Sequence, residues 1–186
     1  MKKIFILFFV ILSSYIFGKN MKNLGDKLIF YGEIENSNKV IAIYQKDKKI
    51  IYTCGVKDKK PEIIVFGTAG KNVFKNVKEV ELDDMIIQKG IDYFIQFKDK
   101  EYIYLLSFSN GMGVEESYYD ITIFKNEEPI YNEVLKMHTI LDFLFTGSIF
   151  FNLPDDDSSF AESYIYYEWT TPTYRSGSFL GSMCFC

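Results

Sequence analysis

The sequence has few of the residues that usually carry catalysis or hold metal ions. It contains one histidine and three cysteines among 186 residues, and no pair of cysteines has the Cys-x-x-Cys spacing of a zinc site. Nucleophilic catalysis by Ser/His or Cys/His would depend on that single histidine. We therefore predict no metal, no cofactor and no catalytic residue, and expect that the protein is not an enzyme.

An excess of positive charge is also missing. The chain has 21 basic and 25 acidic residues, a net charge of −4, and residues 1–18 hold two lysines and no acid, so the rest carries −6. A mildly acidic protein has no field that collects nucleic acid or an anionic membrane surface. We exclude nucleic acid as a partner.

No apolar run is long enough to cross a bilayer, which takes about 20 residues. The clearest run is the nine residues 4–12, which follow Lys2 and Lys3 and precede Gly18. This arrangement predicts a secretory signal peptide over residues 1–18, with export to the periplasm, the cell surface or the exterior and no membrane span afterwards. An uncleaved anchor is the alternative, and Ile16 makes the cleavage position uncertain. Residues 19–26 form a polar leader.

Cysteines are sparse, at Cys54, Cys184 and Cys186. Export permits a disulfide, and a bond from Cys54 to Cys184 or Cys186 would tie the tail to the body. A bond between Cys184 and Cys186 would close a small, strained ring. Three unpaired thiols are the alternative, because small domains stapled by disulfides usually have more cysteines.

Aromatic residues are plentiful, with 14 Tyr and 18 Phe, and they favour strands. Residues 102–108 and 118–124 read as the two strands of a long hairpin around a turn-forming stretch at 109–113. Residues 102–108 are apolar on both faces, which predicts a central strand. In residues 91–97 the apolar side chains alternate, which predicts a strand with one buried face.

Polar turns recur near Asp47, Asn72, Asp99 and Asn126, with strand-like segments between them. This pattern predicts a mainly β fold, an antiparallel β-meander that forms a sandwich or a partly open barrel. We expect one β-rich domain over residues 27–170, followed by a flexible tail rich in Ser, Thr and Gly over 171–186.

One helix is predicted near residues 129–145. Two acids and Pro129 suit a first helical turn. The apolar residues beyond them fall at spacings of three and four, which is typical of a helix with one buried face. These residues are Ile130, Val134, Met137, Leu141 and Leu144.

Three short patterns suggest chemistry but fit it poorly. His138 precedes Asp142 by four residues, yet the nearest serine, Ser148, lacks a nucleophile-elbow context, so a local pair on the helix is expected. Residues 67–72 contain Gly-Lys without phosphate-loop spacing. Residues 155–157 are acidic, but the Gly and Glu of a calcium loop are replaced by Phe160 and Tyr166.

The most plausible recognition surface lies in a final aromatic strand over residues 163–170. Its ligand-binding candidates are Tyr164, Tyr166 and the only tryptophan, Trp169. Such rings offer a large contact area at a small entropic cost, although they could instead complete the core.

Three functions remain open. The preferred one is a non-catalytic binding or inhibitory module of the cell envelope or exterior, with another envelope protein or a glycan as partner. A secreted hydrolase that acts on glycans is the second, with carboxylates drawn from Glu115, Glu116, Asp120 and Glu168. A small outer-membrane barrel is the third. The oligomeric state is not predicted.

Overall fold

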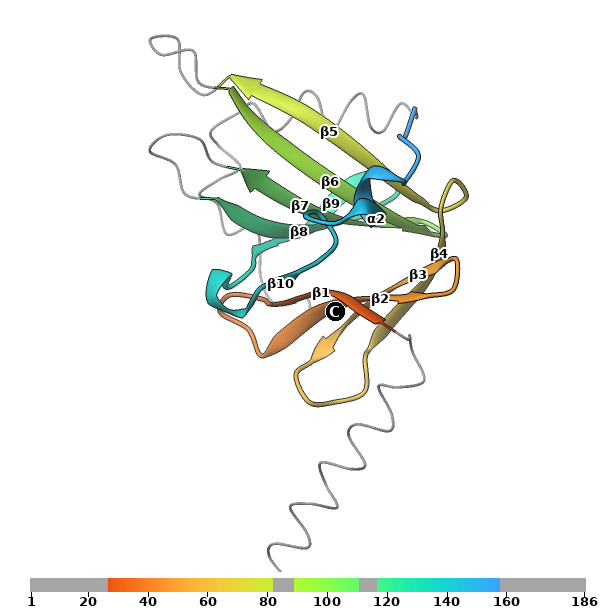
Figure 1. Ribbon diagram of the computed structural model, residues 1–186. Helices are drawn as coiled ribbons and strands as arrows, with labels where there is room; N and C mark the ends of the chain where they lie inside the picture. The colour runs from red at the N-terminus through yellow and green to blue at the C-terminus, as the bar shows by residue number, and fades with distance from the viewer. Residues whose placement is uncertain (1–26, 82–88, 111–116, 158–186) are drawn as a thin grey trace, which may run out of the picture.

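The structure, a computed structural model, describes residues 27–81, 89–110 and 117–157. Its strands form two antiparallel five-stranded sheets, drawn in the lower and upper halves of Figure 1. Within the described residues these sheets are not closed into a barrel. The mainly β prediction is confirmed, and the sandwich alternative describes the arrangement better than a barrel does.

The first sheet has the strand order β10-β1-β2-β3-β4. Short polar turns join its strands, and residues of the type that tolerates a left-handed backbone stand in them: Asn36 (φ 54°), Asp47 (φ 53°) and Asp58 (φ 63°). The strands are β1 (Lys27–Glu33), β2 (Lys39–Lys46), β3 (Lys49–Val56), β4 (Ile63–Thr68) and β10 (Leu141–Asp142).

The second sheet follows the chain in the order β5-β6-β7-β8-β9. Its hairpin of β7 and β8 pairs Leu105 with Thr122, which confirms the predicted pairing of these segments. The apolar strand β7 is central, as predicted. The strands are β5 (Val73–Glu81), β6 (Lys89–Asp99), β7 (Tyr102–Asn110), β8 (Tyr118–Lys125) and β9 (Glu128–Val134).

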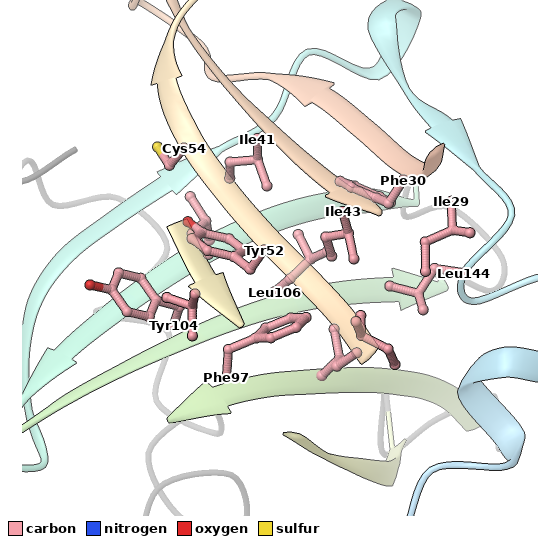
Figure 2. Packing of buried hydrophobic residues seen from close by; sticks show 14 of the residues in the cluster. Ile29, Phe30, Ile41, Ile43, Tyr52, Cys54, Phe97, Tyr104, Leu106 and Leu144 are labelled. Carbon is pink, nitrogen blue, oxygen red and sulfur yellow. The ribbon is translucent and has the colours of Figure 1, made fainter. Parts of the chain in front are cut away.

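One hydrophobic core is shared by the inner faces of the two sheets. Tyr52 of β3 lies with its ring 5.4 Å from that of Phe97 on β6 and 5.1 Å from that of Tyr104 on β7 (Figure 2). Ile43 and Leu106, on opposite sheets, are fully buried in the same cluster. Contact of aromatic rings across the sheets holds the layers together.

The predicted helix near residues 129–145 is wrong. Residues 128–134 form β9, Met137–Thr139 form a 3-10 turn (η1), and the only α-helix in the described part of the chain is α2, Ser148–Phe151. Asn126 (φ 52°) and Glu127 (φ 68°) make a tight turn that returns β9 onto β8. Pro129 falls on this edge strand beside a register shift, where its missing N–H is tolerated.

The expectation of one buried face on β6 is incomplete. Ile95 and Phe97 are buried against the shared core, as predicted, but Asp92, Phe94 and Gln96 on the opposite face are also at most 8% exposed. The second sheet therefore buries both of its faces at β6, and the outer one is partly polar.

Candidate interaction surface

Strand β4 lies at the edge of the first sheet. It pairs with β3 along one side, and no other strand within the described ranges pairs with its opposite side. Its residues 63–68 contain neither lysine nor proline, the residues that commonly block an edge strand. An unblocked edge strand presents backbone groups that another chain can pair with.

Asn72 shows which backbone groups of β4 point outward. Its side-chain Oδ1 accepts the N–H of Thr68 at 2.8 Å, and its Nδ2 donates to the carbonyl of Phe66 at 3.1 Å. Asn72 is not part of the ladder with β3, so these two groups face away from β3. Because the backbone groups of alternate strand residues point the same way, those of Ile64 and the N–H of Phe66 also face outward.

We call these three groups, the N–H and C=O of Ile64 and the N–H of Phe66, the open edge of β4. No hydrogen bond from another described residue reaches them. The adjacent Thr68 N–H and Phe66 carbonyl are already bonded to Asn72. The open edge is therefore short and ends at Phe66.

Phe66 places an aromatic ring beside the open edge. Its side chain is 59% exposed, whereas Ile51, its partner on β3, is 1% exposed. Both belong to the outer face of the first sheet, where two neighbouring rows of mostly apolar residues run across the strands. We call these rows the outer strip: Leu141, Tyr31, Ala42, Thr53 and Ile64 in one row, and Leu28, Tyr44, Ile51 and Phe66 in the other.

Lysines lie at both ends of β4. Lys59 and Lys60 precede it in an exposed turn, and the exposed Lys49 stands opposite Thr68 at its far end, next to Lys46. Residues 27–68 contain eight lysines and five acids, a net charge of +3 in a chain whose overall charge is negative. The open edge therefore lies in the basic part of the protein.

Some acids near this surface are neutralised by lysines. Glu62, just before β4, forms an ion pair with Lys39 at 3.1 Å. Glu33 accepts a hydrogen bond from Lys57, which holds the pKa of Glu33 below its usual range and raises the pKa of Lys57. Beyond these pairs, the five exposed lysines Lys46, Lys48, Lys49, Lys59 and Lys60 outnumber Asp47 and Asp58 in the same turns, so the charge at the two ends of β4 is positive.

The outer face of the second sheet differs from that of the first. Asn76, Gln96, Ser107 and Thr122 lie on it and are at most 4% exposed. Gln96 donates a hydrogen bond to Asp156, and Lys98 forms an ion pair with the same carboxylate at 2.9 Å. Ala42, Tyr44, Ile51 and Thr53 of the outer strip are also at most 5% exposed, so the first sheet differs chiefly in the exposed Phe66 at its edge and in its apolar side chains.

The sequence-predicted recognition residues cannot be placed. Tyr164, Tyr166 and Trp169 lie outside the described residues, and so do Cys184 and Cys186. Cys54 is described and is buried at 1% exposure in the shared core. The two disulfides proposed from Cys54 therefore remain predictions, as does the aromatic recognition strand.

The structure does not assemble the histidine pair considered from the sequence. His138 is exposed in η1, and no hydrogen bond links it to Asp142. Asp142 instead accepts the hydroxyl of Tyr119 at 2.8 Å and the backbone N–H groups of Leu144 and Phe145. Burial, followed by the hydrogen bond to Asp142, strongly raises the pKa of Tyr119, so this contact is a neutral hydroxyl bonded to a carboxylate.

The acidic stretch at residues 155–157 pairs with lysines. Asp155 lies 3.4 Å from Lys75, and Asp156 binds Lys98. Among the described residues, no group of three or more His, Cys, Asp or Glu is arranged to hold a metal ion. The same part of the chain contains no helix long and apolar enough to cross a membrane.

The Gly-Lys stretch at residues 67–72 comprises the last two residues of β4 and the turn that leads to β5. Gly67 is required there because a Cβ would collide with the Val73 side chain and the Ile50 carbonyl. Asn72 ties this turn to both sheets, because its side-chain amide hydrogen-bonds to β4 and to the Lys98 carbonyl of β6. Sequence reasoning missed β4 as a surface, because the run Ile63-Ile64-Val65-Phe66 predicts burial.

No protein-family model, no curated protein and no solved structure matches this chain.

Proposed function

We propose that this protein is a non-catalytic binding module, exported to the cell envelope or exterior, that binds another protein at the open edge of β4. One observation carries the proposal: three outward backbone groups of Ile64 and Phe66 receive no hydrogen bond from any other described residue, and they lie beside a phenylalanine ring that is 59% exposed. Exposed apolar side chains next to unpaired strand edges are typical of protein-binding sites.

A protein partner fits this surface better than a glycan. Backbone N–H and C=O groups along a strand pair best with the backbone of another polypeptide. The outer strip beside them is mostly aliphatic and aromatic, with Thr53 as its only residue that is neither, and Thr53 donates its hydroxyl to the Ala42 carbonyl. Few polar side chains are left on this strip to bond the hydroxyl groups of a sugar.

A carboxylate hydrolase is less well supported. Of the acids considered for that role, Glu115, Glu116 and Glu168 lie outside the described residues. Asp120 is described but is only 2% exposed on β8, so a substrate cannot approach it directly. A glycosidase needs a pair of carboxylates that both reach the substrate.

The test is a binding measurement with a matched control. A partner captured from envelope extract would be purified, and its affinity for the wild-type protein compared with that for Phe66→Ser and Phe151→Ser. Phe151, on α2, is 57% exposed, almost the same as Phe66, but lies on another element. We expect Phe66→Ser to weaken binding about tenfold or more and Phe151→Ser to leave it unchanged. Equal affinity of the wild type and Phe66→Ser would overturn the proposal.

A further inference from the structure

We propose, on the basis of the proposed function, that the bound partner contributes an extended segment that adds a strand to β4 and carries acidic residues on either side of an apolar centre. The backbone of β4, the side chains of its outer face and the charges at its two ends each specify one property of this segment.

The backbone specifies an extended and short segment. Ile64 offers one donor and one acceptor, and Phe66 offers one more donor, at the repeat of a strand. Asn72 occupies the next outward groups, the Phe66 carbonyl and the Thr68 N–H. A segment pairing with β4 therefore finds its hydrogen bonds opposite residues 64–66 and meets the Asn72 side chain beyond them.

The side chains specify an apolar centre. Ile64 and Phe66 both project from the outer face of the first sheet, Ile64 half-buried and Phe66 exposed. A strand added to β4 would place its own alternate side chains directly beside these two. Aliphatic or aromatic residues at two alternate positions would cover the Phe66 ring and continue the outer strip.

The charges specify acidic flanks and disfavour a second copy of this chain. Lys59 and Lys60 lie before β4, and Lys49 and the exposed Lys71 lie near its end. In an antiparallel pair of two β4 strands centred on Val65, Lys59 of one copy would be directed towards Lys71 of the other. Like charges would then meet at both ends of the pair, whereas an acidic segment would be attracted at both.

The experiment uses two acetylated peptides of matched length, Glu-Glu-Val-Thr-Val-Glu-Glu and Lys-Lys-Val-Thr-Val-Lys-Lys, with the purified isotope-labelled protein. Amide hydrogen exchange is followed by nuclear magnetic resonance. The acidic peptide should slow exchange of the Ile64 and Phe66 amides about tenfold or more, because both N–H groups become bonded. The Val65 and Gly67 amides, which face β3, should change little. The basic peptide should bind at least about tenfold more weakly.

A proline variant separates strand addition from simple apolar contact. Ile64→Pro removes an outward N–H without touching the ladder to β3, and it should weaken binding of the acidic peptide about tenfold. Its far-UV circular dichroism should match that of the wild type, which confirms that the sheet remains folded.

Three results would overturn the inference. The Ile64 and Phe66 amides could keep exchanging freely at about millimolar acidic peptide. The two peptides could bind equally well. The amides could become protected without peptide as protein concentration rises, which would make a second copy the occupant. If a purified partner still depends on Phe66 in any of these cases, strand addition by an acidic segment fails while the proposed function stands.

Discussion

Strands β4 and β5 are neighbours in sequence and lie at the edges of different sheets, but their outward backbone groups have different partners. The edge of β5 is covered at Lys75, whose N–H donates to the Pro154 carbonyl at 2.9 Å and whose carbonyl accepts the Asp156 N–H at 3.2 Å. Among the described residues, the edge of β4 is covered by the side chain of Asn72 alone, at the last residues of the strand.

Within the part of the chain that the structure describes, a segment outside the strands closes the edge of β5, whereas none closes the edge of β4. Residues 154–156 run beside β5 like a short parallel strand, and an ion pair between Lys75 and Asp155 reinforces the contact. Natural proteins usually cover, shorten or charge their edge strands because open ones invite pairing. The edge of β4, which no other described strand covers, is therefore the better candidate for pairing with a partner.

The largest predicted effect tests which side of β4 faces β3. Val65→Pro removes an N–H that faces β3 and disturbs a side chain that is 2% exposed, so it should lower the free energy of unfolding by about 3 kcal/mol. Ile64→Pro removes an outward N–H and should cost less than about 1 kcal/mol. Urea unfolding of both variants measures the contrast. Equal losses would show that Ile64 also pairs with β3.

The next effect concerns the cover on β5. Asp156→Ala removes the acceptor shared by Gln96 and Lys98 and should cost about 2 kcal/mol, because the bonds to a buried carboxylate are lost. Asp155→Ala is the control: its side chain is 67% exposed, and its ion pair should contribute less than about 0.5 kcal/mol. Thermal unfolding would distinguish the two variants. Similar melting temperatures would contradict a stabilising contribution of the Asp156 side chain.

A smaller effect is expected at Asn72. Asn72→Ala removes three hydrogen bonds to backbone groups. Water can partly replace these bonds, so the free energy of unfolding should fall by about 1 kcal/mol. Amide exchange at Thr68 should become faster, and the open edge gains one donor, the Thr68 N–H, and one acceptor, the Phe66 carbonyl. Lys71→Ala, in the same exposed turn, should change neither quantity. Unchanged exchange at Thr68 would contradict the role given to Asn72.

The smallest effect on stability is expected at Phe66. Because its ring is 59% exposed, Phe66→Ser should change the free energy of unfolding by less than about 0.5 kcal/mol, although it should strongly weaken partner binding. Urea unfolding and the binding assay, applied to the same variant, would separate the effect on stability from the effect on binding. A large loss of stability would mean that the ring belongs to the core of this protein.

Much of the fold could be predicted from the sequence because alternation and turn residues are local signals. The hairpin of β7 and β8 was evident from apolar residues on both faces of 102–108 and a flexible stretch after them. The turns at Asp47 and Asn126 carry residue types that tolerate positive φ, and the structure places both there.

The helix prediction failed because a spacing of four fits two structures. Ile130 and Val134 lie one above the other on a helix, but they also share a face of a strand. Both are β-branched, which favours a strand, and the tight turn at Asn126 and Glu127 brings them beside β8. Pairing with a neighbouring strand therefore outweighed the helical spacing.

The interaction surface could not be predicted, because whether a strand is central or at an edge depends on its neighbours. The segment Ile63–Thr68 is strongly apolar, and such segments are usually buried on both faces. Neither the exposure of Phe66 nor the outward direction of Ile64 can be read from this run of residues. Asn72 indicates a turn in the sequence, but its hydrogen bonds to β4 could not be predicted from it.

The bare apolar stretch of β4 also has a consequence for handling the protein. Residues 63–68 combine β-branched and aromatic side chains without a charge or a proline, which is the composition that nucleates fibrils when such stretches stack. Concentrated or partly unfolded preparations should therefore aggregate through this segment, and Ile64→Lys should delay that aggregation.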